Sequence, residues 1–211
     1  MKTSLFALLL VCSTLSSMAQ SEANSRMVGI NATSFVKSFL SFNDQTPAGT
    51  PFQFTYRHIG DNGKAFRSKL GLNYSNSTSE EAGEDDKSTL TFLNIQLGLG
   101  YEKRFQLEKR WLIYTGIDGL FGIEQTILKN TSGNDESTDQ EQEVLGGVSP
   151  VLGIQFNITE RLSLSTEAGI PIVYKMNTQK FSGEFSDAKI TTNSFQLTPS
   201  LPTFLYLNLT F

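Results

Sequence analysis

The sequence has little of what most enzymes and secreted small domains rely on. It contains one cysteine, Cys12, one histidine, His58, one tryptophan and six prolines, and 18% of its 211 residues are charged. Mean hydropathy is −0.19. After residue 20 no run of about 20 apolar residues occurs, so the rest of the chain contains no membrane-spanning helix. One cysteine excludes a disulfide framework, and one histidine with one cysteine gives too few of the usual ligands for a zinc site.

The first 19 residues read as a cleavable export signal. Lys2 gives the positive start, an apolar stretch follows, and Ser17-Met18-Ala19 matches a small-residue cleavage site. Cleavage before Gln20 also removes Cys12 and Lys2, which changes the formal charge from −4 to −5. We expect residues 20–26 to be a short polar lead and residues 27–211 to be one domain, stabilised by packing and strand pairing. The acidic balance does not suggest a nucleic-acid partner.

The last strand of the chain has one apolar and one polar face. From 195 to 211 the odd positions are mostly Leu and Phe and the even positions mostly Gln, Asn, Ser and Thr. Such alternation has the period of a β strand. Seven earlier segments share this pattern, with the first the least regular. The eight segments are 27–42, 52–57, 64–75, 89–105, 110–124, 144–158, 162–175 and 195–211.

The connections between these strands alternate in length. We expect loops at 43–50, 76–88, 125–143 and 176–193, and turns of about four residues between them, one of which is the Gly60–Gly63 hairpin signal. Long loops on one side and tight turns on the other are typical of outer-membrane barrels. The sequence therefore predicts an all-β fold: an eight-stranded antiparallel up-and-down transmembrane β-barrel.

The chain resembles the small outer-membrane β-barrel family of Gram-negative bacteria, the eight-stranded barrels similar to OmpX and to the transmembrane domain of OmpA. The resemblance rests on the export signal, the eight segments, the loop rhythm and the closing run from Leu205 to Phe211. It implies a place in the bacterial outer membrane. It also implies an assembly signal, read by the outer-membrane assembly machinery, at Tyr206, Leu207, Leu209 and Phe211. Members have several roles, so the resemblance leaves activity open.

Charged residues occur on the face opposite the apolar rows. A lipid-facing Lys or Arg at mid-membrane costs about 2–4 kcal/mol, so this face must point into the lumen. An eight-stranded barrel is just wide enough for side chains to fill. We expect a lumen charge network that plugs the barrel, with a narrow conduit as the alternative. Its members are Arg57, Arg67, Lys69, Glu102, Asp118, Glu124 and Glu167.

Aromatic residues concentrate at the predicted strand ends. Such side chains favour the two membrane interfaces, so we expect an aromatic girdle. Trp111, Tyr101, Phe105 and Phe211 belong to the periplasmic end of this girdle, and Tyr74, Tyr174 and Phe195 to the outer end.

The remaining candidates for chemistry are weak. The loops 76–88 and 125–143 are each net −4 and offer an extracellular ligand site, but they lack calcium-loop spacing. His58 lies beside a periplasmic turn, away from the outer rim where a lipid-modifying enzyme would work. We therefore expect no catalytic residues, no cofactor and no metal. The best reading is a structural or surface-interaction protein. The alternatives are a porin-like conduit, a rim-active lipid enzyme and a soluble lipocalin-like binder, whose faces would be inverted.

Overall fold

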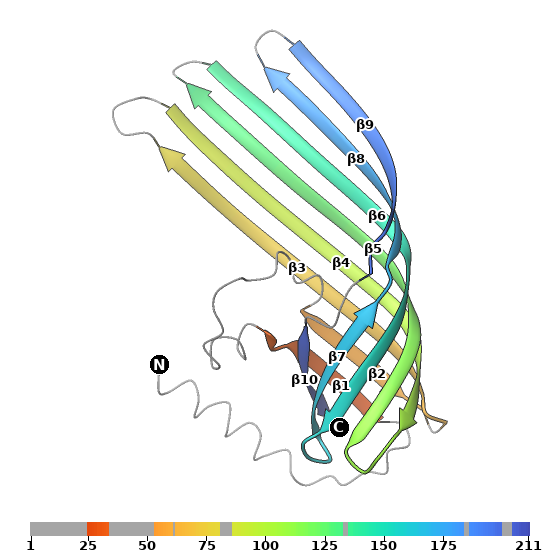
Figure 1. Ribbon diagram of the computed structural model, residues 1–211. Coiled ribbons are helices and arrows are strands. Elements are labelled where there is room, and N and C mark those ends of the chain that lie inside the picture. Colours follow the sequence, from red (N-terminus) through yellow and green to blue (C-terminus); the bar gives the residue numbers. More distant parts are fainter. Residues whose placement is uncertain are drawn as a thin grey trace, which may run out of the picture.

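The computed structural model describes residues 25–33, 53–60, 62–80, 86–132, 135–183, 186–199 and 204–211. Within them the chain forms one antiparallel sheet of ten strands (Figure 1). These strands are β1 (Ser25–Asn31), β2 (Phe54–Ile59), β3 (Lys64–Glu80), β4 (Asp86–Gln106), β5 (Trp111–Ser132), β6 (Asp135–Asn157), β7 (Leu162–Gly169), β8 (Ile172–Gly183), β9 (Ser186–Leu197) and β10 (Leu205–Thr210). No helix in the described residues is long and apolar enough to cross a membrane.

Eight of the strands close into a ring, in the order β1–β2–β3–β4–β5–β6–β7–β10 and back to β1. The predicted eight-stranded antiparallel barrel is therefore confirmed. A path of directly paired residues runs around the ring and returns to β5 ten residues beyond its start. It consists of Trp111, Phe156, Leu164, Leu207, Ile30, Phe54, Leu70, Leu97 and Phe121.

This ten-residue stagger fixes the shape of the barrel. With ordinary strand spacings it implies a tilt of about 40° and a backbone diameter of about 16 Å. Every residue on the path is apolar, and six of the side chains are between 38% and 56% exposed on the outside. The inward-facing Arg57, Arg67, Glu102 and Asp118 are each 1% exposed. The outside is apolar and the inside polar, which excludes the lipocalin-like alternative.

The last two of the eight predicted strands are each divided into two, β7 with β8 and β9 with β10. Pro171 separates β7 from β8, and residues 198–204, which include Pro199, separate β9 from β10. Thr166 pairs with Leu205 and Ile172 with Leu197, so between these two pairs the chain has seven residues on the β9–β10 side and five on the β7–β8 side. A proline has no N–H to donate to a ladder. The expectation of unbroken strands over 162–175 and 195–211 was wrong for this reason, although the two extra residues keep the odd positions facing outward.

Three of the four expected loops are mostly strand. β3 and β4 leave only residues 81–85 between them, β5 and β6 only 133–134, and β8 and β9 only 184–185. The predictions of loops at 76–88, 125–143 and 176–193 were therefore wrong, while 43–50 lies outside the described residues. These segments are mostly polar and carry only a few apolar side chains, so the apolar alternation fades while the backbone ladder continues. In Figure 1, one curved sheet continues past the ring. Its strands are β3, β4, β5, β6, β8 and β9.

The expected tight turns lie at the other end of the barrel. Gly63 has φ of 69°, a left-handed conformation that glycine adopts without strain, and its N–H donates to the Gly60 carbonyl at 3.3 Å. In the turn after β6, the Thr159 hydroxyl accepts the backbone N–H groups of Arg161 and Leu162 at 3.2 and 3.0 Å. β1 begins at Ser25, which pairs with Ile59, so residues 25 and 26 belong to the barrel and not to the expected polar lead.

Candidate functional site: the ion-pair network of the lumen

Six buried charged side chains meet inside the ring and form what we call the lumen network. Arg57 comes from β2, Arg67 and Lys69 from β3, Glu102 from β4, Asp118 from β5 and Glu167 from β7. Successive side chains of a strand point alternately into and out of the barrel. Each of the six lies at an inward-pointing position, because the outward-pointing positions carry the apolar side chains that form a belt around the barrel. All six side chains are between 0% and 8% exposed.

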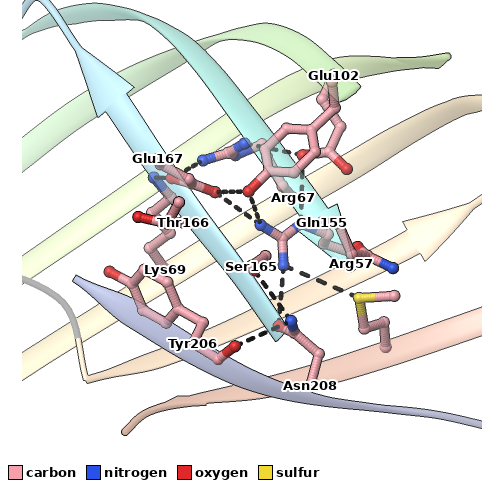
Figure 2. A network of polar contacts seen from close by, with 12 residues as sticks. Arg57, Arg67, Lys69, Glu102, Gln155, Ser165, Thr166, Glu167, Tyr206 and Asn208 are labelled. Atoms are coloured by element: carbon pink, nitrogen blue, oxygen red, sulfur yellow. Dashed lines mark hydrogen bonds and ion pairs between the residues drawn. The ribbon is translucent and has the colours of Figure 1, made fainter. Parts of the chain in front are cut away.

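Glu167 is the centre of the network. β7 and β3 lie opposite each other in the ring, with three strands between them on either side. From β7 the Glu167 carboxylate reaches across the bore to Arg67 Nη2 at 2.7 Å and to Lys69 Nζ at 2.5 Å. Its other oxygen accepts Arg57 Nη2 at 2.7 Å and the Tyr114 hydroxyl at 2.9 Å (Figure 2). One side chain thus joins opposite walls of the barrel.

Glu102 and Asp118 complete the charge balance around the arginines. Arg57 and Arg67 are direct cross-strand partners, a like-charge arrangement that is destabilising by itself. Glu102 Oε2 accepts Arg57 Nε at 3.2 Å and Arg67 Nη1 at 2.8 Å, and so bridges the two guanidinium groups. Asp118 lies 2.9 Å from Arg67 Nε and 3.1 Å from Lys69 Nζ. Each of the three cations of the network therefore has two or more carboxylate partners, the condition for a buried ion pair to be tolerated.

Glycines on neighbouring strands make room for the large side chains of the network. Gly153 is the cross-strand partner of Tyr114, and a Cβ at Gly153 would overlap the tyrosine ring. Gly100 stands in the same relation to Asp118. At Gly146, on the same strand as Gly153 but of opposite parity, a Cβ would meet nothing within 4 Å. The lumen is thus filled by large side chains set against small ones.

The structure adds lumen residues that were not predicted as members. Tyr114 lies under both guanidinium groups, with its ring centre 5.2 Å from Arg57 Cζ. Asn208 of β10 is 0% exposed; it accepts Arg57 Nη1 at 3.3 Å and donates to the Ser165 hydroxyl at 2.9 Å. Both residues have inward parity, so the pattern could have found them. Glu124, which was predicted as a member, lies further along β5 and accepts a hydrogen bond from Asn94.

The network can hold the barrel together and fill its bore. Comparison with known proteins identifies the family that has this architecture. A family model described as outer membrane protein beta-barrel domain matches residues 4–200. The chain belongs to this family. The protein is therefore a bacterial outer-membrane β-barrel that lies in the lipid bilayer, as the sequence resemblance implied.

The other comparisons are distant. The structure of Ail, the attachment invasion locus protein of Yersinia pestis, is similar over 90% of this chain and 99% of that chain, at 12% sequence identity and a TM-score of 0.36. Comparison with curated proteins gives no match.

The seven aromatic residues predicted as the girdle of this outer-membrane barrel all face outward. Their exposed fractions run from 42% for Trp111 to 70% for Phe195. Trp111 packs against Phe156 at the turn end, with ring centres 4.8 Å apart. Tyr174 pairs with Phe195 on the hairpin side. The full set is Tyr74, Tyr101, Phe105, Trp111, Tyr174, Phe195 and Phe211.

The residues predicted as the assembly signal divide between the two faces of β10. Leu207 and Leu209 face outward with Phe211, which is 57% exposed. Tyr206 is 3% exposed and faces the lumen. β10 pairs with β1 on one side and β7 on the other, so the seam between the first and last strands is closed over residues 27–31 and 206–210.

In the part of the chain that the structure describes, no residues join His58 or the acidic segments to form a metal or catalytic site. His58 is exposed on the outward face of β2 beside the Gly60 turn, where it pairs with Arg26 in the strand register. In the described part of the chain, no group of three or more His, Cys, Asp or Glu residues could hold a metal ion.

Proposed function

We propose that this protein is a closed outer-membrane barrel with a structural or surface-interaction role, which displays its long hairpins outside the cell. The observation that carries the proposal is the position of Glu167, which joins Arg57, Arg67 and Lys69 across the bore. A bore crossed by ion pairs offers no continuous water path. Any contact with other molecules must then use the outer surfaces, and the hairpin strands extend past the apolar belt.

The hairpins extend well past the apolar belt. On β5, β6 and β8 the unbroken run of outward apolar side chains ends at Ile123, Val144 and Met176, and two residues further the same face carries Gln125, Gln142 and Thr178. On β3 and β4 the belt extends one pair further, to Tyr74 and Leu93. β5 continues nine residues beyond Ile123, which is about 30 Å of strand. The last row that is apolar on all five of these strands is Leu72, Ile95, Ile123, Val144 and Met176.

Surface labelling in intact cells tests this display. Lys129 and Lys180 are exposed on the hairpins, whereas Lys64 and Lys109 are exposed at the turn end. A membrane-impermeant amine reagent should modify the two hairpin lysines in intact cells, and the two turn lysines only after the outer membrane is opened. Mass spectrometry of tryptic peptides gives the readout. The reverse labelling pattern would contradict the proposal.

A narrow conduit, the alternative role, is disfavoured by the same contacts. Single-channel recording decides between the two roles. The signal peptide, the assembly signal and the assembly machinery as a partner stay predictions from the sequence.

A further inference from the structure

The two faces of the sheet exchange character above the apolar belt. Below its upper edge, the outward face is apolar and the inward face polar. Above it, the outward face carries mainly threonine, glutamine and lysine, with Ile127 as an apolar exception, while most apolar side chains lie on the inward face. They occupy two adjacent cross-strand rows of the hairpin strands and comprise Leu90, Phe92, Leu128, Phe181 and Ile190.

These inward apolar side chains are open to solvent. Leu90 is 42% exposed, Phe181 40% and Ile190 53%. Lipid does not account for them, because they face away from the belt and lie beyond its upper edge. An exposed apolar patch with a polar rim marks an interaction surface in a soluble environment. We call this surface the inner hairpin face.

Charge on the hairpins is also divided between the faces. Asp139 and Glu141 point inward, in the same two rows as the apolar side chains. Lys129, Lys180 and Lys189 point outward. The inner hairpin face is therefore acidic and apolar, and its reverse side is basic.

The inward carboxylates are only partly balanced by other groups. Glu143, one row lower, is paired with Lys175 Nζ at 2.7 Å. Glu141 accepts hydrogen bonds from the side-chain amides of Asn177 and Gln179. Glu124 does so from Asn94. Amides satisfy the oxygens but carry no charge, so the face stays negative and attracts a cation.

We propose that the inner hairpin face docks a cationic amphipathic polypeptide segment outside the cell. Within one cross-strand row Leu128, Asp139 and Phe181 stand side by side, about 4.8 Å from strand to strand. A segment that presents apolar side chains next to Lys or Arg matches this spacing and charge. Anionic lipid headgroups do not, because the carboxylates repel them. The inference rests on the proposed display of the hairpins.

A designed peptide pair tests the docking directly. The full-length protein in nanodiscs of zwitterionic lipid is titrated with a fluorescent peptide of alternating leucine and lysine, and with its leucine–glutamate counterpart. Empty nanodiscs provide the background. The lysine peptide should bind saturably and the glutamate peptide should not. Glu141→Gln should weaken binding about three-fold, the effect of one exposed charge pair. The matched control is Glu80→Gln, which removes a charge on the outer face and should leave binding unchanged.

Cysteine protection identifies the occupied face. The mature chain is expected to lack cysteine, so Ile190→Cys and its outward neighbour Thr191→Cys give single sites. A maleimide should modify both variants without peptide, and the lysine peptide should protect only Ile190→Cys.

Three results would overturn the inference. The first is an Ile190→Cys site that is shielded before peptide is added, which would show that the chain covers its own face. The second is shielding that rises with protein concentration, which would indicate a second copy. The third is an equal response of Glu141→Gln and Glu80→Gln. If peptide binding fails while the hairpin lysines are labelled in intact cells, docking is wrong and display stands.

Discussion

At the scale of single residues, the protein places its charges where lipid cannot reach them. Arg57, Arg67 and Lys69 are tolerated in the lumen because carboxylates from three other strands contact them. Removing one partner of a buried ion pair is costly, because the remaining charges are left uncompensated in a region of low dielectric. Glu167 contacts three cations within 2.7 Å, whereas Glu102 and Asp118 each contact two within 3.2 Å. Loss of Glu167 should therefore destabilise the barrel most.

Replacing this carboxylate should destabilise the folded barrel. We expect Glu167→Gln to lower the free energy of unfolding by about 3–5 kcal/mol, because three buried cations lose a shared counter-charge. Equilibrium urea unfolding of the protein in lipid vesicles, followed by tryptophan fluorescence, measures the change. The matched control is Glu160→Gln in an exposed turn, which should change stability by less than about 0.5 kcal/mol. Equal effects of the two substitutions would show that Glu167 does not hold the network.

At the scale of elements, the sequence predicts best which side chains of each strand face outward and which face the lumen. In a strand with one lipid face, a shift of one residue would exchange every side chain between lipid and lumen, so the pattern is strongly constrained. Val28 and Ile30 of the short first strand face outward as their spacing suggests, at 38% and 47% exposure. Strand ends were predicted poorly, because beyond the apolar belt the outward face is mostly polar and apolar side chains are few, so the alternation no longer reports a strand.

The orientation of β10 can be tested with a label at one position. A bimane attached at Leu207→Cys should be quenched by brominated lipids, because this residue belongs to the outward apolar path around the ring. The same label at Lys180→Cys shares the outward face but lies above the belt, and it should not be quenched. Fluorescence in vesicles gives both values. A Leu207→Cys label that brominated lipids leave unquenched would mean that β10 does not face the bilayer.

At the scale of the whole molecule, the sequence predicted the ring of eight but not its stagger. Closure of the ring follows from strand number and the cost of an open edge in lipid. The ten-residue stagger, the interrupted last two walls and the six-stranded curved sheet above the ring depend on pairing between strands, which a single sequence does not reveal. The same limit applies to the lumen. The alternation of polar and apolar residues predicted that Arg67 and Glu167 face the lumen. Only the closed ring brings Arg67 Nη2 and the Glu167 carboxylate, from strands on opposite sides of the barrel, to 2.7 Å.

Single-channel recording in a planar lipid bilayer tests the central claim, that the lumen network closes the bore. The refolded full-length protein is inserted at neutral pH and moderate salt, and insertion is verified independently by protease protection of the bilayer-embedded strands. The contacts of Glu167 with Arg67 and Lys69 across the lumen predict that the inserted protein shows no resolvable conductance steps. Reproducible conductance steps from the inserted wild-type protein would contradict the account and favour the narrow conduit.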